Sequence, residues 1–214
     1  MHNAFLNIDN KKMSKSDGNF FNVRDILKEY DPQVLRFFML NSHYRSPLNF
    51  SKDLMESAKN ALERIQTAAE QLEYYKENNK NDKALSEEES SVIKEAEALE
   101  QKFIDALDDD FNTADAIAAI FELVKLANIN CSSDSSLELI NTISGKLVGL
   151  CDLLGIIVKK EKELLDDEIE KLILERQEAR KSKNFARADE IRNLLLEKGI
   201  ALEDTREGVR WKRI

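Results

Sequence analysis

The sequence predicts a mostly α-helical protein, in which an antiparallel helical bundle is followed by a small C-terminal α+β domain of two helices and a hairpin. Two observations lead to this fold class. Only six glycines and two prolines occur among 214 residues, so few positions interrupt a helix. Apolar residues recur every three or four positions through most of the chain, which is typical of amphipathic helices.

The first predicted helix begins at Asp31-Pro32, because aspartate favours the N-cap and proline the first helical position. Its apolar face is expected to consist of Leu35, Phe38 and Met39. A second helix is predicted over residues 51–76 and should end at the polar stretch 77–84 (ENNKNDKA). Its apolar face is expected to consist of Leu54, Ala58, Leu62, Ile65, Ala69 and Leu72.

Ser86-x-x-Glu89 has the pattern of a capping box, which predicts the start of a third helix. Its apolar positions are Val92, Ile93, Ala96, Leu99 and Phe103. Residues 110–112 predict a turn into a fourth helix with apolar positions at Ile117, Ile120, Phe121 and Val124. After a loop at 130–136, a fifth helix should run to Leu154, with Gly155 as its C-cap. The last four helices are expected to form the antiparallel bundle.

The charged run 159–163 (KKEKE) predicts a linker to the small domain. Two helices, 166–182 and 184–198, and two strands, 200–203 and 209–214, are predicted there. Asn184 should cap the second helix and Gly199 should close it, while Gly208 should lie in the hairpin turn. The predicted domains are residues 1–50, which precede the bundle, 51–158, which form it, and 159–214, the small domain.

Composition favours a soluble cytoplasmic protein. Charged residues make up 34% and hydrophobic ones 42%, and no apolar run reaches membrane-spanning length. The first residues are polar and mixed, unlike a signal peptide. Cys131 and Cys151 are expected to be reduced thiols at helical core positions rather than a disulfide framework.

The net charge of −9 is unevenly distributed along the chain. Residues 1–64 hold 10 basic and 8 acidic residues, a net +2, and residues 176–214 hold 11 and 7, a net +4. The middle, 65–175, holds 11 basic and 26 acidic residues, a net −15. Because phosphate neutralisation needs only a local positive surface, basic ends are compatible with a long RNA touched at separate places. An ordinary solvated helix surface would give the same counts.

Residues 12–16 (KMSKS) carry the strongest chemical signal. Lysines can stabilise the charge that gathers on a triphosphate when its α-phosphorus is attacked, and serine hydroxyls can add hydrogen bonds. The pentapeptide resembles the signature loop of class I aminoacyl-tRNA synthetases. A solvated surface loop is the alternative for these five residues alone, but the match extends through residues 18–21 (GNFF).

Further blocks narrow the resemblance. They are residues 1–8 (MHNAFLNI), 34–48 (VLRFFMLNSHYRSPL), 108–113 (DDDFNT), 185–192 (FARADEIR) and 199–212 (GIALEDTREGVRWK). Together they resemble the cysteinyl-tRNA synthetase family, from the signature loop onward. The family activates cysteine with ATP and transfers it to the cysteine tRNA. One departure is Asp17, where the family commonly has leucine.

The resemblance implies roles for the loop. Lys12, Met13, Ser14, Lys15 and Ser16 would bind ATP, and Lys12 and Lys15 would be catalytic. The intact enzyme would also use magnesium with its ATP and a zinc ion. The family's His-x-x-His motif and zinc ligands are absent from this chain, whose histidines, His2 and His43, lie far apart. We therefore expect this chain to be a C-terminal fragment of such an enzyme and to be inactive alone. Met1 then need not be a natural start.

The small domain resembles the family's anticodon-binding module. The resemblance implies that Arg180, Phe185, Asp189 and Asp204 meet the anticodon bases, and Trp211 is a further candidate. Unpaired bases can stack on an aromatic ring and be recognised at their edges by carboxylates and guanidinium groups. For Trp211 the alternative is an anchor of the hairpin. For Asp189 it is an ion pair with Arg187 or Arg192 on the helix surface.

Three weaker sites have alternatives of their own. His43, with its neighbours Tyr44 and Arg45, could contact an acceptor stem or form a structural turn ending at Pro47. Arg36 could bind a phosphate or a carboxylate of the bundle. The run 108–110 (DDD) is interpreted as a helix end and turn, because three consecutive carboxylates cannot all face one ion.

Two other functions stay open. One is the cysteine ligase of mycothiol synthesis, a relative that has the signature loop but lacks the anticodon domain. The other is a free-standing, non-catalytic RNA-binding module.

Overall fold

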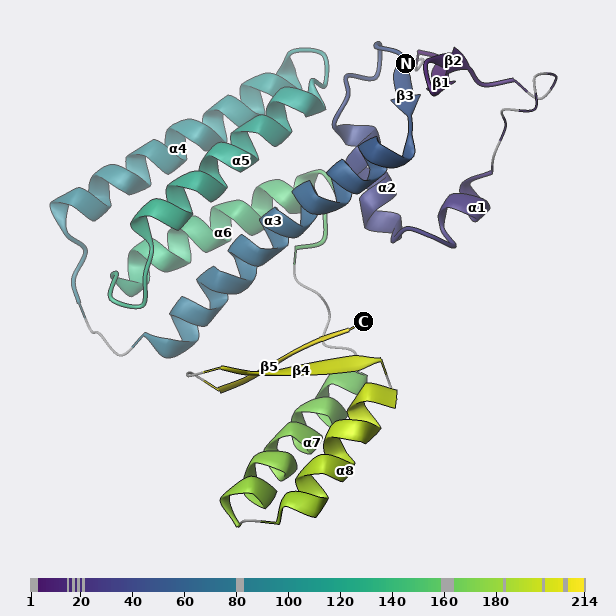
Figure 1. Ribbon diagram of the computed structural model, residues 1–214. Coiled ribbons are helices and arrows are strands. Elements are labelled where there is room, and N and C mark those ends of the chain that lie inside the picture. Colours follow the sequence, from purple (N-terminus) through teal and green to yellow (C-terminus); the bar gives the residue numbers. More distant parts are fainter. Residues whose placement is uncertain are drawn as a thin grey trace. The chain divides into compact units, whose positions relative to one another are not determined.

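The computed structural model describes residues 4–14, 16, 18, 20, 22–79, 83–158, 164–182, 184–197, 199–205 and 208–213. The chain divides into two compact units, Met1–Lys159 and Lys160–Ile214. The mostly α fold class is confirmed, with the helical bundle in the first unit and two helices with a hairpin in the second (Figure 1).

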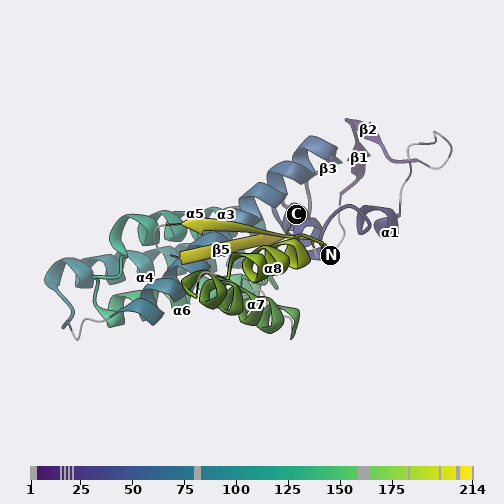
Figure 2. The same ribbon diagram turned by 60° about the horizontal axis from the view of Figure 1, so that its bottom comes forward.

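A small sheet precedes the bundle and was not predicted. Its strands are β1 (Leu6–Ile8), β2 (Lys11–Lys12) and β3 (Leu48–Phe50), in the order β2-β1-β3. β1 is antiparallel to β2 and parallel to β3. Asp9 and Asn10 join β1 to β2 with φ angles of 47° and 65°, the left-handed conformation that two-residue hairpin turns favour. Figure 2 shows the sheet at the end of the unit where α3 begins.

Two short helices connect β2 to β3. They are α1 (Val23–Ile26) and α2 (Pro32–Leu40). The predicted start of α2 is confirmed, since the Asp31 side chain accepts a hydrogen bond from the Gln33 amide at 2.7 Å. Its predicted apolar face is partly wrong: Met39 is 45% exposed, and the buried residues are Val34, Phe37 and Phe38.

The bundle consists of α3 (Lys52–Asn78), α4 (Glu87–Asp108), α5 (Thr113–Asn130) and α6 (Leu137–Leu153). Consecutive helices run antiparallel, and α5 and α6 each pack against both α3 and α4 (Figure 1). The predicted face of α3 needs one correction. Leu54 is 44% exposed, and Met55 is fully buried in its place.

Side chains cap the start of each bundle helix. Ser51, Ser86, Asn112 and Ser136 each accept a hydrogen bond from an amide in the first turn that follows. The predicted capping box is confirmed at Ser86 and Glu89. Glu89 has a second role, because its other oxygen accepts from the Ser136 amide at 2.9 Å. One carboxylate therefore holds the N-termini of both α4 and α6.

The end of α6 forms a Schellman motif, so the predicted glycine closure is confirmed. Gly155 has a φ of 64°, its amide donates to the Asp152 carbonyl, and the Ile156 amide donates to the Cys151 carbonyl. The positive φ favours glycine here, and a Cβ on Gly155 would lie 2.8 Å from Nη1 of Arg36, whose guanidinium would have to shift.

Both cysteines are free, buried thiols, as expected. Burial raises the pKa of Cys131 to about 11 and that of Cys151 to about 12. The expected helical position is wrong for Cys131, which follows α5 as its extended C-cap.

The second unit contains α7 (Leu164–Lys181), α8 (Phe185–Glu197), β4 (Ile200–Thr205) and β5 (Gly208–Arg213). Asn184 caps α8 as predicted, accepting from the Arg187 amide at 3.3 Å. The hairpin is longer than predicted, and Gly208 pairs with Thr205 as the first residue of β5 instead of lying in the turn. The small core of this unit is formed by Ile173, Ile191, Leu195 and Ile200.

None of the helices in the described ranges is both long and apolar enough to span a membrane.

Candidate nucleotide and RNA interfaces

The residues of the signature loop leave the sheet at β2. Lys12 pairs with Asn7 in the β1–β2 ladder, and the Met13 amide donates to the Leu6 carbonyl at 3.0 Å. The hydroxyls of Ser14 and Ser16 lie 2.6 Å apart. The loop is thus anchored on its N-terminal side by backbone hydrogen bonds. The predicted catalytic Lys15 lies outside the described residues, as does Asp17.

The ammonium of Lys12 lies over an aromatic ring. Its Nζ is 4.2 Å from the ring centroid of Phe5, which is 64% exposed. A cation–π contact at such an exposed site contributes only about 0.5–1 kcal/mol. The lysine is therefore held near the loop and can be drawn away by a stronger anionic partner.

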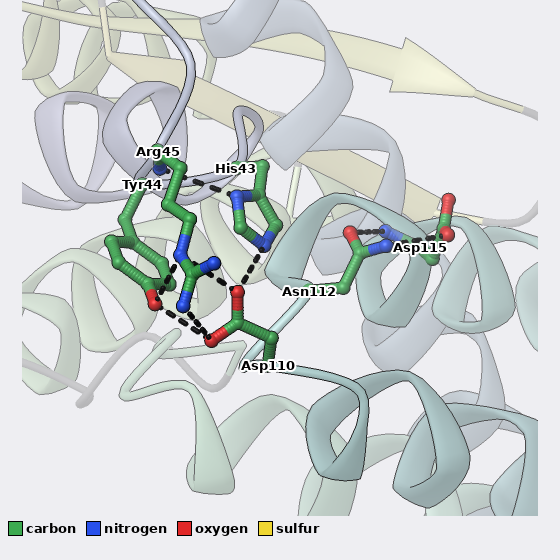
Figure 3. Close-up of polar contacts among 6 residues, drawn as sticks. All are labelled: His43, Tyr44, Arg45, Asp110, Asn112 and Asp115. Carbon is green, nitrogen blue, oxygen red and sulfur yellow. Dashed lines mark hydrogen bonds and ion pairs between the residues drawn. The ribbon is translucent and has the colours of Figure 1, made fainter. Parts of the chain in front are cut away.

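A cluster of polar side chains, which we call the Asp110 bracket, joins the α2–β3 loop to the α4–α5 turn. It consists of His43, Tyr44, Arg45 and Asp110 (Figure 3). The Tyr44 hydroxyl donates to Oδ1 of Asp110 at 2.7 Å, and Nη2 of Arg45 donates to the same oxygen at 3.0 Å. Nε of Arg45 lies 2.9 Å from Oδ2 of Asp110, and Nε2 of His43 lies 3.7 Å from it.

Ring and backbone contacts complete the bracket. The His43 and Tyr44 rings stack with centroids 4.8 Å apart, and the Arg45 amide donates to Nδ1 of His43. A hydrogen bond with the Tyr44 hydroxyl and the charge of Asp110 raise the pKa of Arg45. These contacts support the structural-turn interpretation of residues 43–45. Asp110, their shared partner, was missed because it lies 65 residues away from Arg45.

The α4–α5 turn has an unusual backbone. Asp110 and Phe111 have φ angles of 59° and 54°, although neither is glycine. The turn is held by amide–carbonyl hydrogen bonds to the end of α4, and the Thr113 hydroxyl donates to the Leu40 carbonyl at 2.6 Å. Asn112 and Asp115 start α5 by bonding each other (Figure 3). The interpretation of residues 108–110 as a helix end and turn is confirmed.

Arg36 has a partner that neither prediction named. Its Nη1 donates to the Leu154 carbonyl at 3.2 Å, at the end of α6. Gln33, also on α2, accepts from the Ile157 amide at 2.9 Å. Arg36 therefore joins α2 to the Schellman motif at the end of α6.

The candidate RNA-binding residues lie on the helices and the hairpin of the second unit. Arg180 lies in the last turn of α7, Phe185 starts α8 with 62% exposure, and Asp189 follows one turn later. Asp204 and Trp211 lie on β4 and β5, opposite Val209 and Leu202, and their side chains are outside the description. The five candidates thus lie on both helices and both strands of the second unit.

Asp189 is exposed and does not pair with Arg187. The Arg187 guanidinium instead binds Glu175 at 2.9 Å and Glu190 at 3.0 Å. These carboxylates raise the pKa of Arg187, and the largest cause is the hydrogen bond that Arg187 donates to Glu190. This geometry disfavours the ion pair between Asp189 and Arg187, which was one of the two alternatives for Asp189.

Within the described part of the chain, no group of three or more His, Cys, Asp and Glu side chains is placed to hold a metal ion.

Comparison with known proteins agrees with these elements in order. Residues 1–60 match a family model described as the class I (C) tRNA synthetase catalytic domain. Residues 102–159 match the DALR domain, and residues 162–211 match the cysteinyl-tRNA ligase anticodon binding domain. The cysteine–tRNA ligase of Lachnospira eligens is 64% identical over 213 residues, covering 100% of this chain and 45% of that protein. The chain belongs to the cysteinyl-tRNA synthetase family.

Two further cysteine–tRNA ligases show the same coverage. The protein of Lachnoclostridium phytofermentans is 60% identical over 217 residues, and that of Clostridioides difficile is 50% identical over 214. Each match covers 100% of this chain and 46% of the relative. The chain thus spans a little under half the length of the cysteinyl-tRNA synthetases it matches and corresponds to their C-terminal part.

Proposed function

We propose that this chain supplies the ATP-binding signature loop and the tRNA-binding units of a cysteine–tRNA ligase. The observation that carries the proposal is the order of three family matches along one chain: catalytic domain, DALR domain and anticodon-binding domain. In such an enzyme, cysteine is first joined to AMP from ATP and then transferred to the terminal ribose of its tRNA. The bundle would brace the tRNA, and the domain from residue 159 onward would contact its anticodon.

ATP, with its magnesium, is a substrate in this proposal. Lys12 and Lys15 would place positive charge beside the triphosphate as negative charge develops on the α-phosphate and the leaving pyrophosphate. Lys12 would first leave the Phe5 ring, at a cost of about 0.5–1 kcal/mol, which charge-assisted hydrogen bonds to phosphate exceed. The hydroxyls of Ser14 and Ser16, which bond each other in the structure, would instead donate hydrogen bonds to phosphate oxygens. The backbone bond of Met13 would keep the loop base fixed.

For the RNA, we propose contacts from α7, α8 and the hairpin. Phe185 would stack on an unpaired base, with Arg180 and Asp189 hydrogen bonding to base edges nearby. The exposure of Phe185 supports this contact, because an exposed aromatic ring is available for stacking. The hairpin residues Asp204 and Trp211 would make further contacts with the anticodon.

Two parts of the proposal concern cofactors and location. The intact enzyme would carry its zinc ion on residues outside this chain. A cytoplasmic location follows from the family and can be checked by cell fractionation.

The test is binding of this chain to cysteine tRNA, compared with an anticodon-mutated tRNA, across a salt series. We expect anticodon-dependent binding that weakens with salt. Phe185→Ala should weaken binding to cysteine tRNA about tenfold, because base–aromatic stacking is worth about 1–3 kcal/mol. Leu174→Ala is the matched control, since Leu174 is 60% exposed on α7. Equal binding to both tRNAs would contradict the proposal.

The match over residues 162–211 favours a tRNA ligase over the mycothiol relative, which lacks an anticodon-binding domain. A free-standing RNA-binding module would bind the tRNA but would not restore aminoacylation when combined with the remaining part of a ligase.

A further inference from the structure

The carboxylate of Asp110 is the meeting point of the bundle and the α2–β3 loop. It belongs to the turn between α4 and α5, and it accepts hydrogen bonds from Tyr44 and Arg45 at 2.7 and 3.0 Å. Arg45 also donates to the Tyr44 hydroxyl at 2.9 Å, so the three side chains form a closed ring of contacts (Figure 3). Such mutually bonded groups hold one another in a single arrangement.

The α2–β3 loop, which carries Tyr44 and Arg45, is also hydrogen bonded to the segment that leads into β1. The Tyr44 carbonyl accepts from the Ala4 amide at 2.9 Å, and the Phe5 carbonyl accepts from the Leu48 amide at 3.0 Å. One residue further along, the Leu6 carbonyl accepts from the Met13 amide. Hydrogen bonds and short backbone segments therefore connect Asp110 to Met13 at the base of the signature loop.

The backbone at Asp110 aims its side chain toward this loop. A left-handed conformation is unfavourable for residues other than glycine, and it persists where the surrounding structure holds it. Here Phe111 and Asn112 donate to the last turn of α4, and Thr113 bonds the end of α2. Aspartate is among the residues that best tolerate this conformation. The neighbouring Asp109 is exposed.

We propose that Asp110 is a positioning residue that fixes the signature loop relative to the bundle. It acts through Tyr44 and Arg45 on the backbone of residues 4–6, and through them on Met13. The role in catalysis rests on the proposed function: if the bundle holds the tRNA, the bracket sets where the ATP loop stands relative to it.

The test is amide hydrogen exchange in this 214-residue chain, which needs neither tRNA nor ATP. Asp110→Asn keeps a residue that accepts the positive φ and retains one oxygen acceptor, but it removes the charge. Asp109→Asn removes the same charge one residue away. We expect exchange at the Ala4 and Met13 amides to rise roughly three- to fivefold in Asp110→Asn, the range for a partly exposed charged contact. Asp109→Asn should change it less than twofold.

Amides in the middle of α5 distinguish positioning from general stability. Their exchange should stay within twofold of the unmodified chain in both variants. Arg45→Gln should reproduce the rise at Ala4 and Met13, and the double variant with Asp110→Asn should add nothing further. Unchanged exchange at Ala4 and Met13, or an equal rise in α5, would overturn the proposal. Failure of tRNA binding would instead contradict the proposed function and leave these exchange rates as they are.

Discussion

Replacing Glu89 with alanine removes one carboxylate from the N-termini of two helices. In the structure its Oε2 accepts from the Ser86 amide at 3.1 Å, at the start of α4. Its Oε1 accepts from the Ser136 amide at 2.9 Å, at the start of α6, where Ser136 is fully buried. Alanine leaves both amides without this partner, and the buried one has little access to water.

The expected destabilisation is about 2 kcal/mol. Each lost hydrogen bond contributes about 1 kcal/mol, and a buried amide without a partner adds to that cost. For a protein of this size, 1 kcal/mol corresponds to about 2–4 °C in Tm, so the bundle transition should fall by about 4–8 °C. Calorimetry can follow it separately from the transition of the second unit. Glu87→Ala is the matched control, because Glu87 is exposed in the same first turn.

The effect should also depend on pH. Burial alone would raise the pKa of Glu89, but the amides of Ser136 and Ser86 outweigh it and lower the pKa below 4.5. The folded state therefore favours the ionised carboxylate, and this stabilisation is present above pH 4.5 and lost as the pH falls through the folded pKa. The difference between the unmodified chain and Glu89→Ala should shrink below pH 4.5. An unchanged difference at pH 3, or a Tm equal to that of Glu87→Ala, would refute the reasoning.

Two further predictions concern the end of α6 and the bundle core, and both are measured by urea unfolding. Gly155→Ala should destabilise by about 1–2 kcal/mol or more, since alanine disfavours the positive φ and its Cβ would meet Arg36. Gly149→Ala, inside α6 with open space at its Cβ, should stabilise by about 0.5–1 kcal/mol, and destabilisation there would contradict the reasoning. Leu147→Ala should cost about 2–5 kcal/mol because Leu147 is fully buried. Leu153→Ala, at 69% exposure, should stay within about 0.5 kcal/mol, and equal losses for the two leucines would refute the assignment of the core.

Local signals predicted the helices well. Asp31, Ser86, Asn184 and Gly155 were identified as caps because capping depends on groups only a few residues apart. The sheet was missed for the opposite reason. Its strands have two or three residues each, too few to show alternation, and β1 pairs with a strand about 40 residues away.

The partners of the site residues could not be predicted for the same physical reason. Arg36 bonds the carbonyl of Leu154, 118 residues away. Because every residue has a backbone carbonyl, the residue type at position 154 does not indicate this partner. The residue types predicted what chemistry the candidate site offers, and the tertiary arrangement decides which of those groups can act together.

The two buried thiols can report local unfolding of this chain through their reaction with a thiol reagent. At pH 8 a thiol with a pKa of about 11 or 12 is almost entirely protonated and shielded, whereas an unfolded cysteine with a pKa near 8.5 is substantially thiolate. A maleimide should therefore label the chain only as fast as it opens. Cys131 lies at the end of α5 and Cys151 in the last turn of α6. Mass spectrometry of the two labelled peptides would time the loosening of each helix end without any introduced probe.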